Sequence, residues 1–406
     1  MRVLHVVKTA DGARWAAWQS AVLARHGVEV HVVLPSDHGD AVELWEQAGA
    51  TLHVANWSLP LREPWTWPQR AREIRALVDS VAPDIVHSHF VTTTLAVRRA
   101  LGDQRRVPTV FQVPGPLHLE HSVYRAAELK SARASDYWIA SSRYIARRYW
   151  RSGVSLERVF LSYYGSPLSP CPNTDARQTV RQQFDISPDQ FVVGSISYMY
   201  PPKYYLGQTS GLKRHEDIID AIGIASREHP DLIGLVIGGE WGGGSNYFSR
   251  LCERAEAVAP GRIRLPGPVH FGNAASMWSL FDCVLHLPMS ENCGGVVEPL
   301  AAHVPTIASR VGGLPEVVFD GITGSLVPVK SPADAARAIE RVRSSPAQAH
   351  GEARRGGDLV REMFRVERTG AEVAQIYRHI LDPTFPPPEM FDSLTYARSL
   401  AGTADV

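Results

Sequence analysis

The sequence predicts an α/β protein built from two Rossmann-like domains. Its 406 residues are too many for one hydrophobic core of ordinary size. Short apolar runs rich in Val and Ile alternate with segments of helical periodicity, which is the pattern of parallel sheets covered by helices. Residues 164–175 are rich in Pro and Ser, as in a linker between domains. Length, alternation and linker together predict the two-domain fold.

The first domain is expected to comprise residues 1–165. Its strands are predicted at 2–7, 28–34, 51–54, 85–87, 109–113, 134–140 and 159–161. Its helices are predicted at 15–26, 41–48, 65–81 and 143–150. The β-loop-α-β start is Rossmann-like, but the turn at Gly12 and Ala13 lacks the G-x-G-x-x-G pattern, so a dinucleotide is not expected there.

The second domain is expected to span residues 191–384, after a linker and entry helix within 166–190. Its strands are predicted at 191–197, 232–237, 263–265, 283–287 and 306–309. Its helices are predicted at 215–228, 247–257, 274–281, 333–344, 354–364 and 366–381. A further helix is predicted in the tail, at 390–400.

The segment 290–316 places carboxylates beside glycines, between two predicted strands. Glu291 and Glu298 bracket Gly294 and Gly295, where a strand-end loop is expected to lead into a helix. Backbone N–H groups at the positive end of a helix suit a phosphate, and glycines let a ligand approach the backbone closely. Ionised carboxylates accept hydrogen bonds from vicinal hydroxyls. The segment therefore predicts a nucleotide-sugar pocket.

The same segment resembles the donor-site signature of retaining glycosyltransferase family 4, the glycosyl transferases group 1. Residues 298–305 (EPLAAHVP), 311–316 (VGGLPE) and 320–324 (DGITG) match that signature. The family leaves seven residues between its two glutamates, whereas Glu291 and Glu298 leave six, so Ser290 or Glu291 takes the first position. We favour Glu291, with a loop one residue shorter. The resemblance implies the GT-B fold, in which two Rossmann-like domains face each other across a cleft.

In the second domain, the resemblance implies the donor site. Lys213 would meet the charge of the leaving diphosphate, Glu298 would hold the ribose hydroxyls, and Glu291 would hold hydroxyls of the transferred sugar. Backbone N–H groups would bind the transferred sugar at Asn292, Cys293, Gly294 and Gly295. Backbone groups would hold the nucleotide base at Gly267 and Val269. The family's phosphate-binding arginine is missing, because Ser197 or Tyr198 takes its place. Lys203 or Arg214 could supply that second positive charge.

In the first domain, the resemblance implies the acceptor site. Gly12 and Ala13 would correspond to the family's turn that faces the donor phosphates or the acceptor. A histidine that contacts the donor sugar usually closes the strand at 109–113, but Gln112 or Val113 stands there, and His118 is close enough to substitute. His87 and His89 match an H-x-H pattern common in the family. The tail 385–406 would cross back and complete this domain.

The implied reaction is transfer of a hexose-type sugar from a nucleotide diphosphate sugar, most commonly a UDP-sugar, with retention of configuration. The acceptor would be a glycan, a lipid-linked glycan or a natural product. No metal ion or other cofactor is required, and a donor phosphate oxygen would take the acceptor proton. The Tyr-rich loop 198–212 is either a lid or acceptor platform, or a surface insertion.

Composition limits the other classes of function. A formal net charge of zero and a sequence pI of about 7.3 argue against a nucleic-acid-binding protein. The four cysteines lack metal-ligand spacing and are expected to be reduced thiols. The apolar run at the N-terminus is too short for a signal peptide, and no run suits a spanning helix, so a cytoplasmic protein is expected. The oligomeric state is not predicted.

Three alternatives remain open from the sequence. A catalytically silent GT-B partner protein is compatible with the missing arginine. A nucleotide-sugar epimerase shares the architecture, but would need additional acid–base residues in the first domain. The Trp- and Arg-rich stretches 65–75 and 143–151 could make a weak peripheral contact with anionic membrane, although solvated basic helices are the simpler interpretation.

Overall fold

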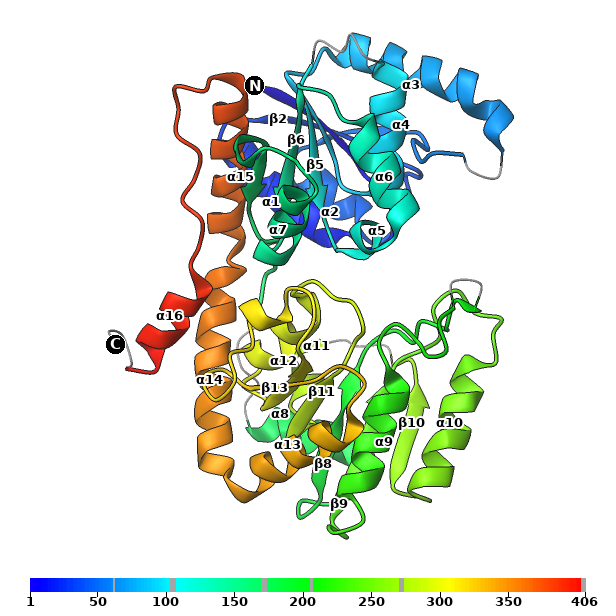
Figure 1. Ribbon diagram of the computed structural model, residues 1–406, viewed down its shortest axis with the longest axis vertical. Coiled ribbons are helices and arrows are strands. Elements are labelled where there is room, and N and C mark those ends of the chain that lie inside the picture. Colours follow the sequence, from blue (N-terminus) through cyan, green and yellow to red (C-terminus); the bar gives the residue numbers. More distant parts are fainter. Residues whose placement is uncertain (61–62, 103–106, 169–173, 205–206, 270–273, 403–406) are drawn as a thin grey trace. The chain divides into compact units, whose positions relative to one another are not determined.

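The computed structural model describes residues 1–60, 63–102, 107–168, 174–204, 207–269 and 274–402. The chain divides into two compact units (Figure 1). The first unit comprises Met1–Pro167 and Met363–Phe391, and the second comprises Leu168–Glu362 and the chain from Asp392 onward. Each unit is a parallel sheet covered by helices, as the sequence predicts.

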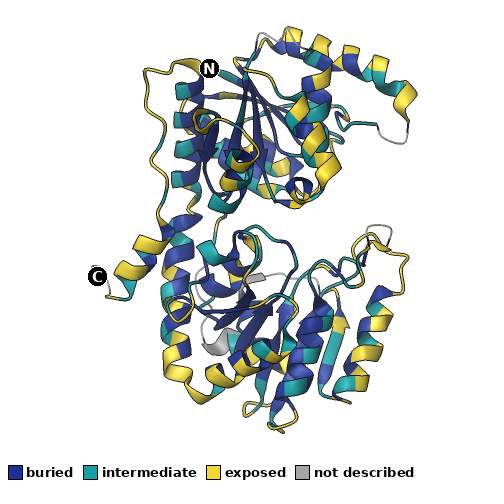
Figure 2. Cartoon of the chain, viewed as in Figure 1, coloured by how far each residue is buried: buried dark blue, intermediate teal, exposed yellow. Residues whose placement is uncertain are grey.

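The first unit is built on a seven-stranded parallel sheet in the order β3-β2-β1-β4-β5-β6-β7. Its strands are β1 (Arg2–Val6), β2 (Glu29–Leu34), β3 (Thr51–Val54), β4 (Ile85–Ser88), β5 (Thr109–Val113), β6 (Asp136–Ala140) and β7 (Val159–Leu161). Its helices are α1 (Arg14–Arg25), α2 (Val42–Gln47), α3 (Trp67–Val81), α4 (Val91–Leu101), α5 (Leu117–Glu120), α6 (Ser122–Ser131), α7 (Arg143–Arg151) and α15 (Val366–Leu381). The central strands are buried and the helices expose their outer faces (Figure 2), which explains the continuous apolar runs in the sequence.

The second unit is built on a six-stranded parallel sheet in the order β10-β9-β8-β11-β12-β13. Its strands are β8 (Phe191–Ile196), β9 (Leu232–Ile237), β10 (Ile263–Gly267), β11 (Cys283–His286), β12 (Thr306–Ser309) and β13 (Ser325–Val327). Its helices are α8 (Thr174–Gln183), α9 (His215–Ala225), α10 (Tyr247–Val258), α11 (Ala274–Trp278), α12 (Val297–Ala301), α13 (Pro332–Ser344), α14 (Pro346–Met363) and α16 (Ser393–Leu400). A 3₁₀ turn, η4 (Gly294–Val296), precedes α12.

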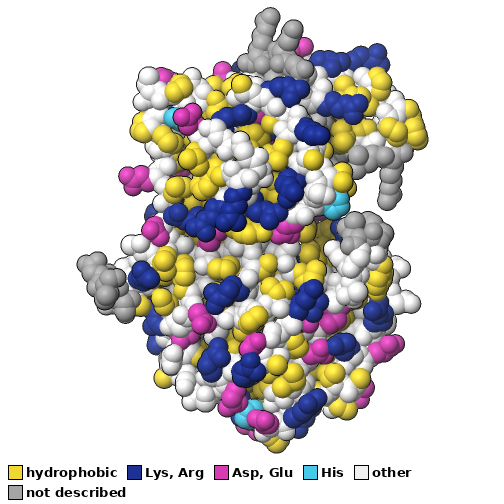
Figure 3. All heavy atoms as spheres, in the orientation of Figure 1, with side chains coloured by type: hydrophobic (Ala, Val, Ile, Leu, Met, Phe, Trp, Pro, Cys, Tyr) yellow, Lys and Arg dark blue, Asp and Glu magenta, His cyan; other side chains and the backbone are white. Residues whose placement is uncertain are grey.

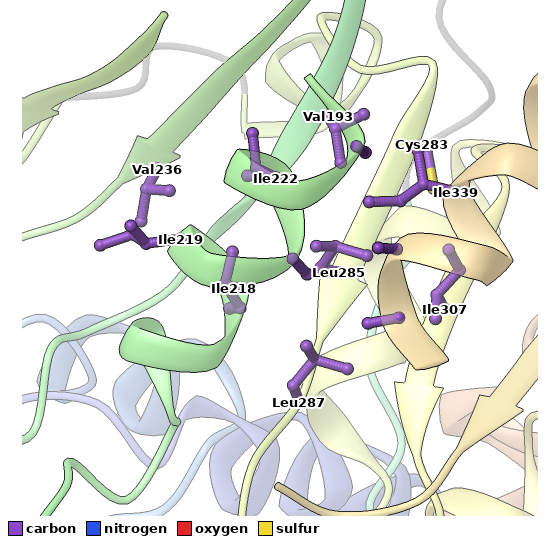
Figure 4. Packing of buried hydrophobic residues seen from close by; sticks show 14 of the residues in the cluster. Val193, Ile218, Ile219, Ile222, Val236, Cys283, Leu285, Leu287, Ile307 and Ile339 are labelled. Atoms are coloured by element: carbon purple, nitrogen blue, oxygen red, sulfur yellow. The ribbon is translucent and has the colours of Figure 1, made fainter. Parts of the chain in front are cut away.

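Apolar side chains from the two faces of this second sheet form its core. One cluster joins Ile218 and Ile222 of α9 to Leu285 of β11, Ile307 of β12 and Ile339 of α13. Figure 4 shows these side chains pointing toward one another between the helices and the sheet. The core therefore holds β8 and β11 rigidly below the loops that follow them.

In the described part of the chain, four α-helices and strands are absent from the predicted set, and one of them, α5, has only four residues. The helix α4 begins VTTTLAV, and its β-branched residues have low helix propensity, so tertiary packing decides its conformation. The helix α6 buries only Glu128 and shows no apolar stripe. The strand β13 has three residues, too few to show periodicity.

The C-terminal region is divided between the units differently from the expectation that residues 385–406 complete the first domain. Residues 385–391 group with the first unit as expected, but so does α15, whose Val373, Ile376 and Tyr377 are buried in the core of that unit. The helix α16 follows Asp392 and groups with the second unit. The apolar stripe of α15 explains the difference, because it offers far more surface to bury than α16 does.

In both sheets the strand order reverses direction at one point. The reversal lies between β1 and β4 in the first unit and between β8 and β11 in the second. Loops that leave neighbouring strands at such a point diverge, and the crevice outside their carboxyl ends is the usual ligand site of open α/β sheets.

Candidate functional site

The candidate site lies where the loops after β8 and β11 leave the second sheet. Met289 in the loop after β11 donates its backbone N–H to the carbonyl of Leu212 over 3.0 Å, which joins the two loops. Lys213 follows Leu212, and Glu291 lies two residues beyond Met289. The fold thus brings together two residues that are far apart in the sequence.

Lys213 and Glu291 form an ion pair between Nζ and Oε2, and their side chains are only 18% and 15% exposed. His286, the last residue of β11, places Nε2 3.2 Å from the same Oε2. The backbone N–H of Asn292 donates to the other oxygen, Oε1, over 3.1 Å. Both oxygens of the Glu291 carboxylate are therefore held by donors.

Electrostatics keep the Glu291 carboxylate ionised. Burial alone would raise the pKa of Glu291, but the charge of Lys213 and the hydrogen bond from His286 outweigh it and hold the pKa well below its usual value. Burial also lowers the pKa of His286, although Glu291 opposes this shift. A neutral imidazole beside a carboxylate must donate its proton, so Nε2 of His286 carries the hydrogen.

The glycines around this carboxylate lack a side chain for different physical reasons. A Cβ added at Gly295 would lie 2.1 Å from Nε2 of His286, so the imidazole occupies the space a side chain would need. A Cβ added at Gly294 would meet nothing within 4 Å, which leaves room for a ligand. At Gly312, φ is +58° and a Cβ would lie 1.8 Å from the Glu291 carbonyl oxygen. The V-G-G motif therefore lets the next loop close against Glu291.

Glu298 lies on α12, away from the ion pair. Its Oε2 accepts a hydrogen bond from Nε1 of Trp278 over 3.1 Å, while the residue itself is exposed. Trp278 belongs to an apolar cluster against which Val269 packs. Gly267 ends β10 with a φ of +84°. Trp278 thus links Glu298 to the segment predicted to bind the base.

The predicted helix after Gly295 is shorter than a phosphate-binding helix usually is. It consists of η4 and then of α12, which has five residues. A dipole that builds up over so few peptide units is small, so backbone N–H groups and Lys213 have to carry most of any anion binding. Cys293 contributes only its backbone, because its buried Sγ lies 3.4 Å from the carbonyl oxygen of Gly313.

The structure distinguishes between Arg214 and Lys203, the two residues proposed to replace the phosphate-binding arginine of the family. Arg214 forms a two-pronged ion pair with Asp217 and is 9% exposed, so its charge is already matched. Lys203 is exposed. Ser197, one of the residues in place of the family arginine, lies with its Oγ 3.0 Å from Nε2 of His215. Of the two proposed substitutes, Lys203 alone has an exposed side chain.

Two loops place aromatic side chains beside the ion pair. Tyr198 and Trp241 are 59% and 53% exposed, and their rings make an edge contact at 5.0 Å. Tyr200 packs on Trp241 at 5.5 Å, and the pKa of Tyr200 is raised by burial and by the nearby charge of Glu291. Met199 N–H donates to Gly239 over 2.9 Å and fixes the two loops together. Part of the Tyr-rich loop, residues 205–206, lies outside the described residues.

In the first unit, the predicted residues lie at the ends of β1 and β5. Gly12 and Ala13 have φ values of +75° and +51° in the turn before α1. His118 is buried, with Nε2 3.0 Å from the Tyr149 hydroxyl, and burial lowers its pKa to about 4. Gln112 is paired with Gln19 inside the core. The site of the second unit does not include these residues.

A histidine cluster at the ends of β1 and β4 is an additional feature of the first unit. Nδ1 of His5 lies 3.0 Å from Nε2 of His89, and Nδ1 of His87 contacts the Tyr377 hydroxyl. One ring nitrogen from each histidine lies within 4.8 Å of the others. The rings of His87 and His89 stack at 4.2 Å and present faces rather than lone pairs to each other. We interpret this group as a buried hydrogen-bonded cluster that carries the H-x-H pattern.

Several arginines of the two Trp- and Arg-rich helices make hydrogen bonds within the first unit. Arg70 and Arg75 of α3 donate to backbone carbonyls, as do Arg143 and Arg148 of α7. Figure 3 shows Lys and Arg side chains gathered over the part of this unit where α7 lies. Among the described helices, none is long and apolar enough to span a membrane.

Family models of known proteins match a large part of each unit. The family model described as "Glycosyl transferases group 1" matches residues 199–355, and the one described as "Glycosyltransferase Family 4" matches residues 17–166. A D-inositol 3-phosphate glycosyltransferase of Streptomyces bingchenggensis is 26% identical over 65% of this chain and 59% of its own length. The corresponding protein of Streptomyces avermitilis is 30% identical over 72% of this chain and 65% of its own length. The matches thus span less than two thirds of these relatives.

Solved structures resemble the chain over nearly its full length. HepE of Anabaena, crystallised with UDP, aligns with a TM-score of 0.76 and 19% identity over 93% of this chain and 99% of that one. A sucrose-phosphate synthase of Thermosynechococcus elongatus aligns with a TM-score of 0.74 and 20% identity over 94% and 100%. At these identities the likeness concerns the fold.

Proposed function

Because the chain belongs to the glycosyl transferases group 1 of glycosyltransferase family 4 and has the GT-B fold, we propose that it transfers a sugar from a nucleotide diphosphate sugar to a hydroxyl acceptor. The observation that carries this proposal is the pairing of Lys213 with Glu291 at the strand-order reversal of the second sheet. There the ammonium group of Lys213, which can bind a diphosphate, lies beside the carboxylate of Glu291, which can accept hydrogen bonds from hydroxyls.

The proposed donor is a UDP-hexose. HepE of Anabaena has been crystallised with UDP and with UDP-glucose, which makes UDP-glucose the first donor to test. Lys213 would stabilise the charge that develops on the leaving diphosphate. Glu298 would accept hydrogen bonds from the ribose, in exchange for or in addition to that from Trp278. Lys213 supplies a positive charge of its own, and we propose that no metal ion is needed.

The proposed chemistry retains the anomeric configuration. The sugar would leave through an oxocarbenium-like state on the face where the acceptor attacks. A donor phosphate oxygen would accept the proton from the acceptor hydroxyl, so no protein base is required. This agrees with the burial of His118, whose lowered pKa makes it a weak proton acceptor and whose Nε2 already contacts Tyr149.

The acceptor is proposed to be a polyhydroxylated molecule. The relatives named above are D-inositol 3-phosphate glycosyltransferases, so phosphorylated cyclitols belong in the first acceptor panel, beside glycans, lipid-linked glycans and glycosylated natural products. A lipid-linked acceptor would agree with a weak membrane contact through α7. Co-sedimentation with vesicles of phosphatidylglycerol, compared with vesicles of phosphatidylcholine, tests that contact.

Donor binding tests the proposal directly. Thermal unfolding is followed with UDP, GDP, ADP and their common sugar conjugates for the wild type and for Lys213→Ala. A ligand that binds the folded state raises its stability by mass action. We expect UDP and one UDP-sugar to stabilise the wild type, and Lys213→Ala to lose most of that shift, whereas the control Lys130→Ala in α6 keeps it. No stabilisation by any nucleotide would overturn the proposal.

One observation favours a second candidate, a catalytically silent partner protein. The place of the family arginine is taken by Ser197 or Tyr198, and the charge of Arg214 is matched by Asp217. Such a protein would bind the donor without turning it over. Release of UDP from the stabilising UDP-sugar, measured with and without the acceptor panel, distinguishes the two: sustained release supports the transferase.

A further inference from the structure

We propose that His286 is a positioning residue for the transferred sugar, which keeps the Glu291 carboxylate in place when the diphosphate draws Lys213 away. This inference rests on the proposed function and adds a residue that the family signature does not include. His286 is 6% exposed and belongs to β11, so its ring stands on the rigid sheet and not on a loop.

Lys213 cannot serve both anions at full strength. Its ammonium group has three N–H donors, and one is directed at Oε2 of Glu291. A diphosphate carries more negative charge than a carboxylate, so its arrival pulls the ammonium group toward it. Glu291 then loses its strongest partner at the moment when it has to recognise hydroxyls.

His286 is built to remain when Lys213 moves. Its Nε2–H lies 3.2 Å from Oε2, while the Asn292 N–H holds Oε1 at 3.1 Å. The backbone at Gly295 lies against Nε2, because a Cβ there would come within 2.1 Å of it. The ring is therefore confined on one side by η4 and on the other by the carboxylate. Two fixed donors leave the remaining lone pairs of Glu291 directed at a ligand.

The arrangement separates the recognition of the nucleotide from that of the sugar. UDP alone would engage Lys213 and the exposed Glu298, and among the described residues no hydrogen bond joins His286 to either of them. A UDP-sugar also needs Glu291 in its proper orientation. Loss of the His286 donor should therefore weaken the binding of a UDP-sugar more than that of UDP.

The test compares two variants of His286. His286→Gln keeps an N–H donor near the position of Nε2, and His286→Leu removes the donor but preserves an apolar volume. Dissociation constants for UDP and for UDP-glucose are measured by calorimetry, together with the melting temperature of each variant. A purely structural role would lower both affinities in parallel, so the ratio of the two constants is the informative quantity.

We expect His286→Leu to raise the ratio of the UDP-glucose constant to the UDP constant by about tenfold or more, the effect of losing one hydrogen bond to a charged group. We expect His286→Gln to keep the ratio within about threefold of the wild type. An unchanged ratio in His286→Leu, or an equal change in both variants, would overturn this inference alone. Failure of the wild type to bind any nucleotide would overturn the proposed function and this inference with it.

Discussion

Gly295 and its neighbour Gly294 offer a matched pair of substitutions at the candidate site. In Gly295→Ala the new methyl group would lie 2.1 Å from Nε2 of His286, against an ordinary contact distance of roughly 3.5 Å. The imidazole is 6% exposed and lies between η4 and the Glu291 carboxylate, so the shift of about 1.4 Å that the methyl group demands distorts its 3.2 Å contact with Glu291. Gly294→Ala meets nothing within 4 Å and leaves His286 in place.

The magnitudes follow from these contacts. Overpacking a buried site costs about 1–3 kcal/mol, whereas replacing a glycine in a helical turn without a clash gains roughly 0.5–1 kcal/mol. The gain is common to both variants, because both glycines lie in η4, so we expect the second unit of Gly295→Ala to be less stable than that of Gly294→Ala by about 1–3 kcal/mol. Urea unfolding followed by far-UV circular dichroism measures the difference.

The same pair separates stability from recognition. We expect the preference for UDP-glucose over UDP to fall in Gly295→Ala and to stay near that of the wild type in Gly294→Ala, when both are assayed well below their unfolding temperatures. Equal stability of the two variants would refute the close packing of Gly295 on His286. Reduced preference in Gly294→Ala alone would show that the ligand, and not His286, occupies the space beside these glycines.

Three further predictions concern acidity, metal ions and the aromatic side chains. Burial lowers the pKa of His215 to about 3 from its ordinary value of 6.5, so the stability that its neutral form contributes is complete above about pH 6.5 and falls by about 2 kcal/mol on going to pH 5. The denaturation free energy of His215→Gln, measured across this range, should vary less with pH than that of the wild type. Sugar transfer should survive EDTA, and Lys213→Ala should lower kcat by about 10²-fold or more without rescue by Mg²⁺; loss of wild-type activity in EDTA would contradict this. Trp241→Ala should raise the KM for the acceptor with little change in the affinity for UDP. Trp241→Phe should keep that KM near the wild-type value. An equal effect of Trp241→Ala on both ligands would argue against an acceptor platform.

The sequence predicts the strands more reliably than the residues between them. The strands β3, β5, β7, β9 and β12 have the predicted boundaries, because each is a short apolar run bounded by turn residues. The helix α4 could not be predicted in the same way, since its threonines favour other local structures and the core imposes the helix.

The candidate site was only partly predictable for a related reason. Lys213 and Glu291 stand in recognisable motifs, and the structure brings them into contact. His286 lies inside an apolar strand, where a histidine gives no signal until the fold shows the carboxylate five residues later beside it. The pairing of Arg214 with Asp217 likewise depends on the left-handed conformation of Arg214, with φ of +55°, which spacing alone does not reveal.

Because α15 packs in the first unit but lies near the end of the chain, the first unit cannot complete its core until late in synthesis. During synthesis the first seven strands emerge early, but Val373, Ile376 and Tyr377, which complete their core, emerge only after all six strands of the second sheet have been made. The nascent first half therefore exposes an apolar face until translation is nearly finished. A gene fragment that encodes residues 1–167 alone should yield an aggregation-prone product, and chimeras that exchange the second unit between relatives need junctions at 167/168, 362/363 and 391/392.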